Sequence, residues 1–454
     1  MKKYSVALLL AMAVGLAACS SDQADTKDDD EAAKDPVTTD SEETDDAEEE
    51  DHVNRTPDMD FDLGGKTIKV VSWWDMEIED SSPDNIARIE NLEELKEKHN
   101  FEIEYVAIDY GEYQQRVTAS LLAGEPIGDI VRLGKTYTVP TIVEQDLLWP
   151  IDEYTKNENA FNQAVTNDLY TYDGRGYGFT EDKSNLVQGI FYNRTLMNEL
   201  GMKSLQEYVD EDTWDWDTFI ATIKEANVDR NNDGNIDTWG LANQSVLERA
   251  LASNNTSLTV DDQQNLEDPA TVEALEFLSK IATEELARPT EGGDWTEPGQ
   301  FFREGNVLMY GGALWELGGF QDDMPEYDLG FVPFPKGPSA TDYYSYEGLF
   351  QALTIPKSVD NPEQLLYIWE KINDIDSIYD YPGQQSYETL FTDEADIENA
   401  KMVAENMLVL DHFTFENLEY YEFEAEILDG TSVSTVIEMY KSNFQAAIDE
   451  VYKK

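Results

Sequence analysis

The chain has 454 residues, with 96 acidic and 31 basic side chains and a formal net charge of −65. Such a surface repels nucleic acid and anionic lipid head groups, so nucleic acid is excluded as a partner. The length exceeds one typical hydrophobic core, and a single cysteine excludes internal disulfides.

The first residues have the pattern of a secretion signal. Lys2 and Lys3 precede an apolar run over 6–16, which is too short to span a bilayer as a helix. Small residues then lead to Cys19, the only cysteine. The pattern resembles a bacterial lipoprotein signal, in which the cysteine is lipidated and becomes the new N-terminus. We therefore expect a signal peptide over 1–19 and lipidation of Cys19. The protein would then be lipid-anchored on the extracellular face of the cell membrane.

The segment 20–60 is acidic and polar, with 18 acidic and 3 basic residues. It has almost no aromatic or branched apolar side chains, so it cannot bury enough surface to offset chain entropy. We expect a disordered tether. The acid excess continues beyond it, since 61–454 carries 78 acidic and 26 basic residues. We expect such a fold to gain stability at high salt, where the Debye length is about 3 Å at 1 M.

After the tether, predicted strands alternate with predicted helices. Ser82 and Pro83 are suited to begin a helix, and Gly124 is suited to end one. Apolar periodicity predicts strands over 67–73, 101–107 and 129–133, and helices over 83–95, 113–121 and 139–145. This alternation implies crossover connections and a parallel sheet.

Later in the chain, helices predominate. Asp268 with Pro269, and Asn361 with Pro362, mark two helix starts, and Gln364 is placed for a capping box at the second. Apolar residues recur at helical spacing over 433–451. The sequence therefore predicts a mixed α/β chain with more helix than strand.

Several segments together resemble the bacterial extracellular solute-binding proteins of ABC importers, in the class that binds sugars and oligosaccharides. The segments are LLAGEP (121–126) with GDIV (128–131), LLWPI (147–151), IFYN (190–193), TWDW (213–216) and FREGNVLM (302–309). In the first segment, two residues separate Pro126 from Asp129, which is a departure from the family pattern. Before the second segment, Asp146 stands where that family has a glycine.

The resemblance implies an α/β, helix-rich, two-lobed periplasmic-binding-protein-like fold of type II, with a ligand cleft between the lobes. It assigns 61–187 plus 351–405 to lobe 1, and 188–350 plus 406–454 to lobe 2. Ligand capture would proceed by hinge closure. The implied partners are a small-molecule or oligosaccharide ligand and the permease subunits of an ABC transporter, with the binding protein itself a monomer.

Candidate ligand-binding residues follow the predicted strands, because ligands in open α/β sheets bind beyond the carboxyl ends of strands. Trp73, Trp74 and Asp75 end the first strand, and Lys135 and Tyr137 follow the third. Neighbouring strand residues face opposite ways, so one of the two tryptophans is expected in the core. The structural alternative for the second pair is a solvated turn.

In the second half of the chain, Trp315 follows two glycines that allow close backbone approach, and the resemblance supports it as an aromatic ligand contact. Tyr344 and Glu347 precede the expected second crossing between the lobes. Trp239 is a weaker candidate, which packing beside a neighbouring loop would also explain.

The segment 229–237 matches most of an EF-hand calcium loop. It offers oxygens from Asp229, Asn231, Asp233, Asn235 and Asp237. The twelfth position holds Gly240 instead of the expected glutamate. We expect a structural calcium ion and no catalytic cofactor. The alternative is a turn whose side chains hydrogen-bond to their own backbone.

The sequence gives little support for an enzyme. Asp60 occupies the first glycine position of a phosphate loop, and His52, His99 and His412 have no metal or triad spacing. We predict a binding protein that captures a carbohydrate and delivers it to a permease. The alternatives are a surface-anchored polysaccharide-binding adhesin or sensor, or a glycan-active enzyme.

Overall fold

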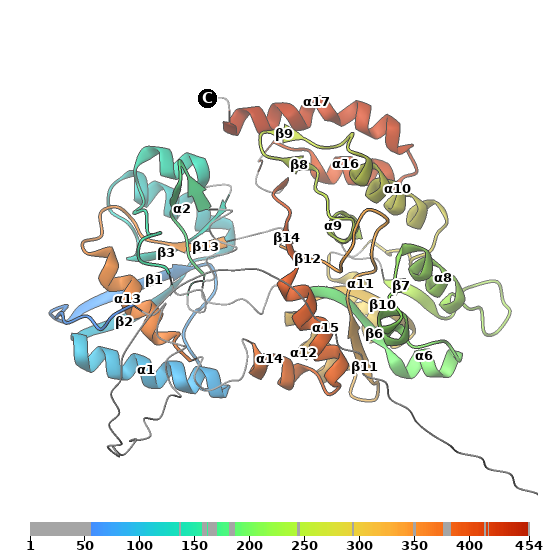
Figure 1. Ribbon diagram of the computed structural model, residues 1–454, viewed down its shortest axis with the longest axis horizontal. Coiled ribbons are helices and arrows are strands. Elements are labelled where there is room, and N and C mark those ends of the chain that lie inside the picture. Colours follow the sequence, from blue (N-terminus) through green and yellow to red (C-terminus); the bar gives the residue numbers. More distant parts are fainter. Residues whose placement is uncertain are drawn as a thin grey trace, which may run out of the picture. The chain divides into compact units, whose positions relative to one another are not determined.

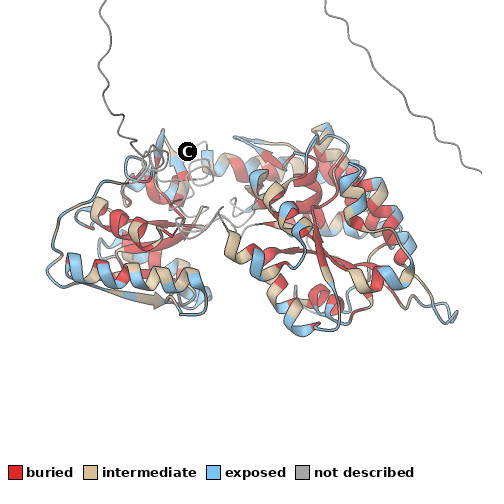
Figure 2. Cartoon of the chain, turned by 60° about the horizontal axis from the view of Figure 1, so that its bottom comes forward, coloured by how far each residue is buried: buried red, intermediate tan, exposed pale blue. Residues whose placement is uncertain are grey.

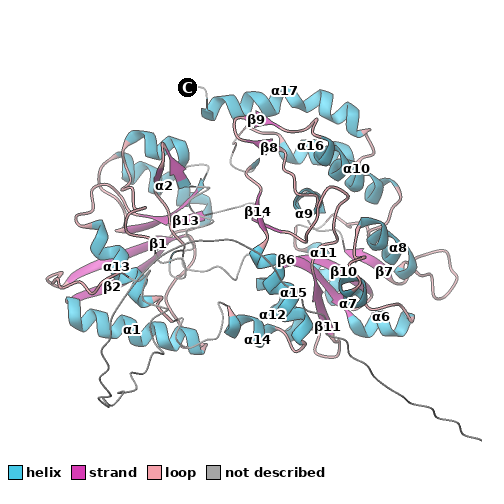
Figure 3. Cartoon of the chain, viewed as in Figure 1, coloured by secondary structure: helices cyan, strands magenta, loops and turns pink. Residues whose placement is uncertain are grey.

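The computed structural model describes residues 56–135, 138–156, 161, 170–180, 187–242, 246–292, 295–347, 351–375, 383–412, 415 and 417–452. The predicted signal peptide, Cys19 and the tether up to residue 55 lie outside these residues. Two four-stranded sheets, each flanked by helices, form the framework (Figure 3). The shorter elements are β4 (Thr171–Tyr172), β5 (Arg175–Gly176), α6 (Arg194–Leu200), α7 (Leu205–Asp210), α9 (Val246–Ser253), β8 (Thr259–Val260), β9 (Gln263–Gln264), α11 (Glu297–Arg303), β12 (Ser345–Glu347), α14 (Gln384–Leu390) and β14 (Met407–Val409).

The first sheet has the strand order β13-β3-β1-β2. Strands β1 (Lys66–Ser72), β2 (Phe101–Ala107) and β3 (Ile130–Gly134) are parallel to one another, which confirms the predicted crossovers. Strand β13 (Gln351–Thr354) enters from a distant part of the chain and pairs antiparallel with β3.

Helices cover both faces of the first sheet (Figure 1). Ile68 and Val70 face α1 (Pro83–His99) and α13 (Pro362–Ile372), whereas Val71 faces α2 (Tyr110–Leu122). Side chains alternate between the faces of a strand, so β1 contributes to the apolar core on each face of the first sheet. Figure 2 shows the result, with buried strands between helices that expose only their outer sides.

The helix starts follow their predicted caps at two of three places. Ser82 accepts a hydrogen bond from the backbone N–H of Asn85 (3.2 Å), and Asp268 caps α10 (Pro269–Thr283) in the same way. The capping box predicted at Gln364 is wrong. Asn361 adopts a left-handed conformation with φ of 53°, and its side chain makes no capping hydrogen bond.

The helix predicted over 139–145 is also wrong. The structure has two short helical turns, η1 (Thr138–Ile142) and η2 (Val143–Gln145), with an extended Val139 inside the first. A proline at position 140 removes a backbone donor, so a regular helix cannot continue through this segment.

The second sheet has the order β11-β6-β10-β7. Strand β10 (Val307–Ala313) lies between β6 (Gln188–Asn193), to which it is antiparallel, and β7 (Trp239–Ala242), to which it is parallel. Strand β11 (Leu329–Val332) completes the sheet beside β6. One large core surrounds this sheet. Its helices include α8 (Trp216–Ala226), α12 (Leu314–Asp323), α16 (Tyr420–Leu428) and α17 (Val433–Tyr452).

The family resemblance assigned the whole segment 351–405 to lobe 1. In the structure, this segment is divided between the core of the first sheet and the core of the second sheet. Strand β13 and α13 belong to the first sheet. Helix α15 (Glu394–Glu405) packs instead against β11, where Asp396 pairs with Arg194 at 2.6 Å. We therefore propose that the third crossing between the lobes, which the resemblance implies near residue 405, falls between α13 and α14. The lobe boundaries remain a proposal.

Within the described residues, no helix has both the length and the apolar character needed to cross a membrane.

Candidate functional site

An aromatic cluster stands at the carboxyl end of β1. The ring of Trp73 makes edge contacts with Trp74 (4.7 Å between centroids), Tyr113 (5.3 Å) and Tyr110 (5.8 Å). Trp73 packs inward against α2, whereas Trp74 is 41% exposed and Tyr110 is 72% exposed. The half-buried ring of Trp73 contacts the exposed rings of Trp74 and Tyr110, and these three rings form an aromatic shelf.

The shelf rests on a buried framework. Tyr113 donates its hydroxyl hydrogen between two backbone carbonyls, at 3.0 Å from Val71 and 2.7 Å from Arg132. Burial raises the pKa of Tyr113, so its hydroxyl keeps the proton that these carbonyls require. The position of Trp73 is therefore fixed by α2 and by the two central strands.

Arg132 is a site residue that the sequence reasoning missed. It lies inside β3 and is buried, with its guanidinium carbon 4.6 Å from the ring centre of Trp74 and Nη2 3.8 Å from the sulfur of Met76. A cation over an indole face holds the ring in place. The signal was present, because an arginine in the middle of a buried strand is unusual without a specific partner.

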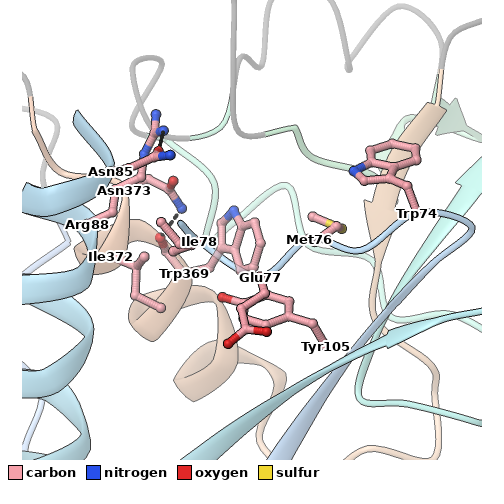
Figure 4. Close-up of a pocket in the computed structure, with 10 residues that line it drawn as sticks. All are labelled: Trp74, Met76, Glu77, Ile78, Asn85, Arg88, Tyr105, Trp369, Ile372 and Asn373. Atoms are coloured by element: carbon pink, nitrogen blue, oxygen red, sulfur yellow. Dashed lines mark hydrogen bonds between the residues drawn. The ribbon is translucent and has the colours of Figure 1, made fainter. Parts of the chain in front are cut away.

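A hollow opens beside the exposed face of Trp74 (Figure 4). Its volume is about 230 Å³, which is below the ~300–1,000 Å³ of drug-sized sites and suits a single small unit. Its walls come from the segment after β1, from α1, from β2 and from the end of α13. The lining residues are Trp74, Met76, Glu77, Ile78, Asn85, Arg88, Tyr105, Trp369, Ile372 and Asn373.

The other predicted residues near the first sheet have separate surroundings. Asp75 is exposed and accepts a hydrogen bond from the backbone of Glu77 at 3.0 Å. Lys135 follows β3 and pairs with Asp411 at 3.6 Å, where both side chains are largely buried. The solvated-turn alternative for Lys135 is therefore wrong. Tyr137 lies outside the described residues.

At the second sheet, Trp315 is the second residue of α12, which directly follows β10, and it is 63% exposed. The glycines before it are required for a reason the sequence did not show. A Cβ atom on Gly311 would lie 3.0 Å from Nε of Arg249, and one on Gly312 would lie 2.6 Å from the ring of Tyr310. Arg249 is buried and donates to the side chain of Gln188 at 2.9 Å. The sequence reasoning missed this polar pair at the edge where β10 ends and β6 begins.

A second buried group lies where α9 meets α16. Tyr420 donates to Oε1 of Glu248 at 2.7 Å, and the ring of His412 stacks on Tyr420 with 4.6 Å between centroids. Burial lowers the pKa of His412 to about 3. Burial, with a smaller contribution from the charge of Glu248, raises the pKa of Glu424 to about 8. At neutral pH this group therefore holds a neutral imidazole and a largely protonated Glu424.

The remaining aromatic candidates are not brought together. Trp239 begins β7 and pairs in register with Val307 at the start of β10, so it lies at the opposite edge of the second sheet from Trp315. Its packing against the second core fits the structural alternative. Tyr344 is half-buried beside β12, and Glu347 ends that strand.

The calcium prediction is not supported. The described residues contain no group of three or more His, Cys, Asp or Glu side chains positioned to hold a metal ion. In the loop, Asp229 accepts hydrogen bonds from the backbone of Asn232 (2.7 Å) and Gly234 (2.9 Å), and Asp237 accepts one from Arg230 (2.7 Å). Acceptance from the backbone N–H of Asn235 lowers the pKa of Asp233. The loop oxygens are thus engaged by the loop itself.

The architecture is that of a binding protein built on two α/β units, with exposed aromatic rings at strand ends. The chain matches the bacterial extracellular solute-binding protein family over residues 82–372 and belongs to that family. Family membership implies a binding protein rather than an enzyme and an extracellular location.

Two curated relatives share part of the sequence. The chain is 30% identical over 169 residues to the arabinooligosaccharide-binding protein of Halalkalibacterium halodurans, which covers 35% of this chain and 34% of the relative. It is 25% identical over 249 residues to the arabinooligosaccharide-binding protein of Bacillus subtilis, which covers 52% of this chain and 54% of the relative. The chain thus spans between a third and about half of the length of these relatives.

Solved structures show the same fold. UspC of M. tuberculosis superposes with a TM-score of 0.62 at 16% identity, over 84% of this chain and all of that chain. The galacto-N-biose-/lacto-N-biose I-binding protein of Bifidobacterium longum gives 0.61 at 15% identity, over 86% and 98%. The GacH receptor of Streptomyces glaucescens gives 0.59 at 15%, over 86% and 99%. The predicted helix-rich α/β fold of a two-lobed binding protein is confirmed.

Proposed function

We propose that the protein captures an oligosaccharide outside the cell and delivers it to the permease of an ABC importer. The observation that carries the proposal is the aromatic shelf of Trp73, Trp74 and Tyr110, which is held by Arg132 at the carboxyl edge of the first sheet. Aromatic faces match the C–H faces of sugar rings, and nearby charged and amide groups match the hydroxyls. The names of both curated relatives support arabinose-containing oligosaccharides as the first ligands to test.

Capture would proceed by closure of the two α/β units on the ligand. The first sheet would supply the aromatic shelf, and the second would supply Trp315 with the Arg249–Gln188 pair at the end of β10. Closure buries the sugar and shifts the population toward a closed form only if the ligand contacts both units. Residues 188–350 and 383–452 are proposed as the second unit, and 61–187 with 351–375 as the first.

A thermal-melt panel tests this function. A ligand at one hundred times its dissociation constant should stabilise the fold by about 2.7 kcal/mol. Arabino-oligosaccharides, malto-oligosaccharides, peptides and polyamines should be compared in high salt. Stabilisation by an oligosaccharide is expected, and stabilisation by peptides or polyamines alone would reject a carbohydrate ligand.

We further propose that Cys19 carries the lipid anchor and that 20–60 is the tether between membrane and binding protein. Stable anchoring takes more than one acyl chain, which lipoprotein modification supplies by resemblance. A Cys19→Ser variant should be released into the medium, whereas the wild type should fractionate with membranes. Equal release of both forms would reject the anchor.

For the loop 229–237, the hydrogen bonds support a self-capped turn in place of calcium. Melting with EDTA and then with millimolar calcium should give no shift. A calcium-dependent rise that Asp229→Asn abolishes would restore the calcium site.

A further inference from the structure

The hollow beside Trp74 contains hydrogen-bond donors without acceptors. Trp369, on α13, is only 5% exposed, yet its indole Nε1 is buried and has no hydrogen-bond partner. The guanidinium Nε of Arg88, on α1, is buried and unpartnered in the same way. Both residues line the hollow. Buried donors are normally satisfied, so two such donors in one cavity wall call for an external acceptor.

Arg88 also lacks a counter-ion among the described residues. Its one described polar contact is from Nη1 to the side-chain oxygen of Asn85, at 3.2 Å. Asp84 lies one turn earlier on α1, but its Oδ1 also has no partner. Glu77 is the acidic residue of the lining, and it is exposed, so solvent screens its charge. In so acidic a chain, an arginine in a cavity wall that forms no ion pair with any described carboxylate is unusual.

The remaining lining fits a sugar ring. Figure 4 shows Trp74 at one end of the hollow and Arg88 with Asn85 at the other, with Ile78 and Trp369 between them. The apolar faces suit ring carbons, whereas a guanidinium fork suits a carboxylate, which it can bind bidentately. The indole N–H suits a hydroxyl oxygen. The chemistry that satisfies all three is a sugar unit that carries a carboxylate.

We propose that this hollow is a side pocket for a uronic acid unit of the captured oligosaccharide, with Arg88 as the carboxylate-binding residue. The inference rests on the proposed function, because the pocket would hold one unit of the captured oligosaccharide. The neutral part of the chain would lie on the shelf of Trp73, Trp74 and Tyr110, and the acidic substituent would enter beside Trp74.

Isothermal titration with matched ligands tests the pocket. Xylotriose and the same trisaccharide bearing one glucuronic acid differ only in the acidic unit. We expect the wild type to bind the acidic ligand roughly ten to a hundred times more tightly, as for a charge-assisted pair. Arg88→Gln should abolish this preference and leave neutral binding unchanged. Arg88→Lys, which keeps the charge without the fork, should retain part of it.

Arg116→Gln is the matched control, because it makes the same charge change on an exposed helix face of the first unit. It should leave both affinities unchanged. Equal affinity for the two ligands in the wild type would overturn the pocket and leave oligosaccharide capture standing. Equal loss of both ligands in Arg88→Gln would assign Arg88 a purely structural role and overturn the pocket as well.

If neither the trisaccharides nor the melt panel give binding, the proposed function fails, and free glucuronate then decides the pocket. The probe is the indole ¹H–¹⁵N resonance of Trp369, assigned with Trp369→Phe. A shift with millimolar glucuronate but not with glucose, lost in Arg88→Gln, would retain the pocket. Absence of a shift would overturn it.

Discussion

The two sheets differ in the groups that surround the exposed rings at the ends of their strands. At the first sheet, Trp74 and Tyr110 are exposed and rest mainly on edge-to-face ring contacts. At the second sheet, Trp315 is exposed as well, and the buried ionisable residues Glu248 and Arg249 lie on α9. Arg249 is held by Gln188 beside Gly311, and Glu248 is held by Tyr420. Exposed rings cost little in stability and are ready for a ligand, whereas buried charges are stable only while their partners stay in place.

The difference predicts that changes to the exposed rings act on the proposed binding surface, whereas changes to the buried ionisable residues act on the stability of the fold. Removal of a ring from the shelf should weaken binding and leave the fold intact. Removal of a buried charge near the second sheet should affect the fold itself. The predictions below probe this contrast, from the largest expected effect to the smallest.

Asp396→Ala should give the largest loss of stability. Asp396 is buried and accepts hydrogen bonds from Arg194 (2.6 Å) and from the backbone of Phe331 (3.0 Å). Its removal leaves the largely buried guanidinium with only the exposed carboxylates of Asp328 and Asp393, which should cost about 3–5 kcal/mol in urea unfolding. Asp328→Ala removes an exposed partner of the same arginine and should cost at most about 1 kcal/mol. Comparable losses in the two variants would contradict the contrast.

Glu424→Gln should change the pH dependence of stability. A carboxyl pKa raised to about 8 means that the folded state binds more protons than the unfolded state between the ordinary glutamate pKa and pH 8. Stability therefore falls as pH rises through this window. His412, with a pKa lowered to about 3, has the opposite effect below pH 6.5. Unfolding free energies measured from pH 6.5 to 8 should show a wild-type decline of about 1–2 kcal/mol, allowing for partial exposure of Glu424.

The variant should lose most of that decline. Glu422→Gln on the exposed side of the same helix is the charge-matched control and should keep it. An unchanged slope in Glu424→Gln would show that the carboxyl titrates normally.

Trp74→Ala should separate binding from stability at the first sheet. The ring is 41% exposed, so unfolding should change by no more than about 1 kcal/mol, while oligosaccharide affinity should fall by roughly tenfold or more. Trp295→Ala removes another exposed ring, 65% accessible, and should leave affinity unchanged. A loss of several kcal/mol in Trp74→Ala would mean that the shelf is part of the core.

Lys135→Met should have the smallest effect. Its largely buried ion pair with Asp411 links the end of β3 to the segment after β14. Because Asp411 also accepts a hydrogen bond from Thr259, the loss of the pair should cost only about 1 kcal/mol. Lys69→Met breaks an exposed pair with Glu104 and should cost less than about half of that. Both costs should shrink in molar salt if charge attraction is their cause. A larger loss for Lys69→Met would contradict the assignment.

Local patterns were sufficient to predict much of the first half of the fold. Strands β1, β2 and β3 fall within a residue of their predicted ranges, because apolar alternation reports burial directly. Ser82 and Asp268 begin helices as predicted, because a cap is a contact between near neighbours in sequence. The resemblance to solute-binding proteins also came from ordered local motifs. Trp73 and Trp74 could be named as candidate site residues because they follow a recognisable strand.

Contacts between distant segments decided the rest. Arg132 of β3 contacts Trp74, which follows the neighbouring strand β1. Arg249 fills the space beside Gly311, and α15 packs into the core of the second sheet rather than that of the first. The donors of Arg88 and Trp369 share a cavity although they are far apart in sequence. Sequence periodicity shows which side chains are buried but not which ones meet. Burial follows from local hydrophobicity, whereas the choice of partners depends on how the sheets and helices assemble.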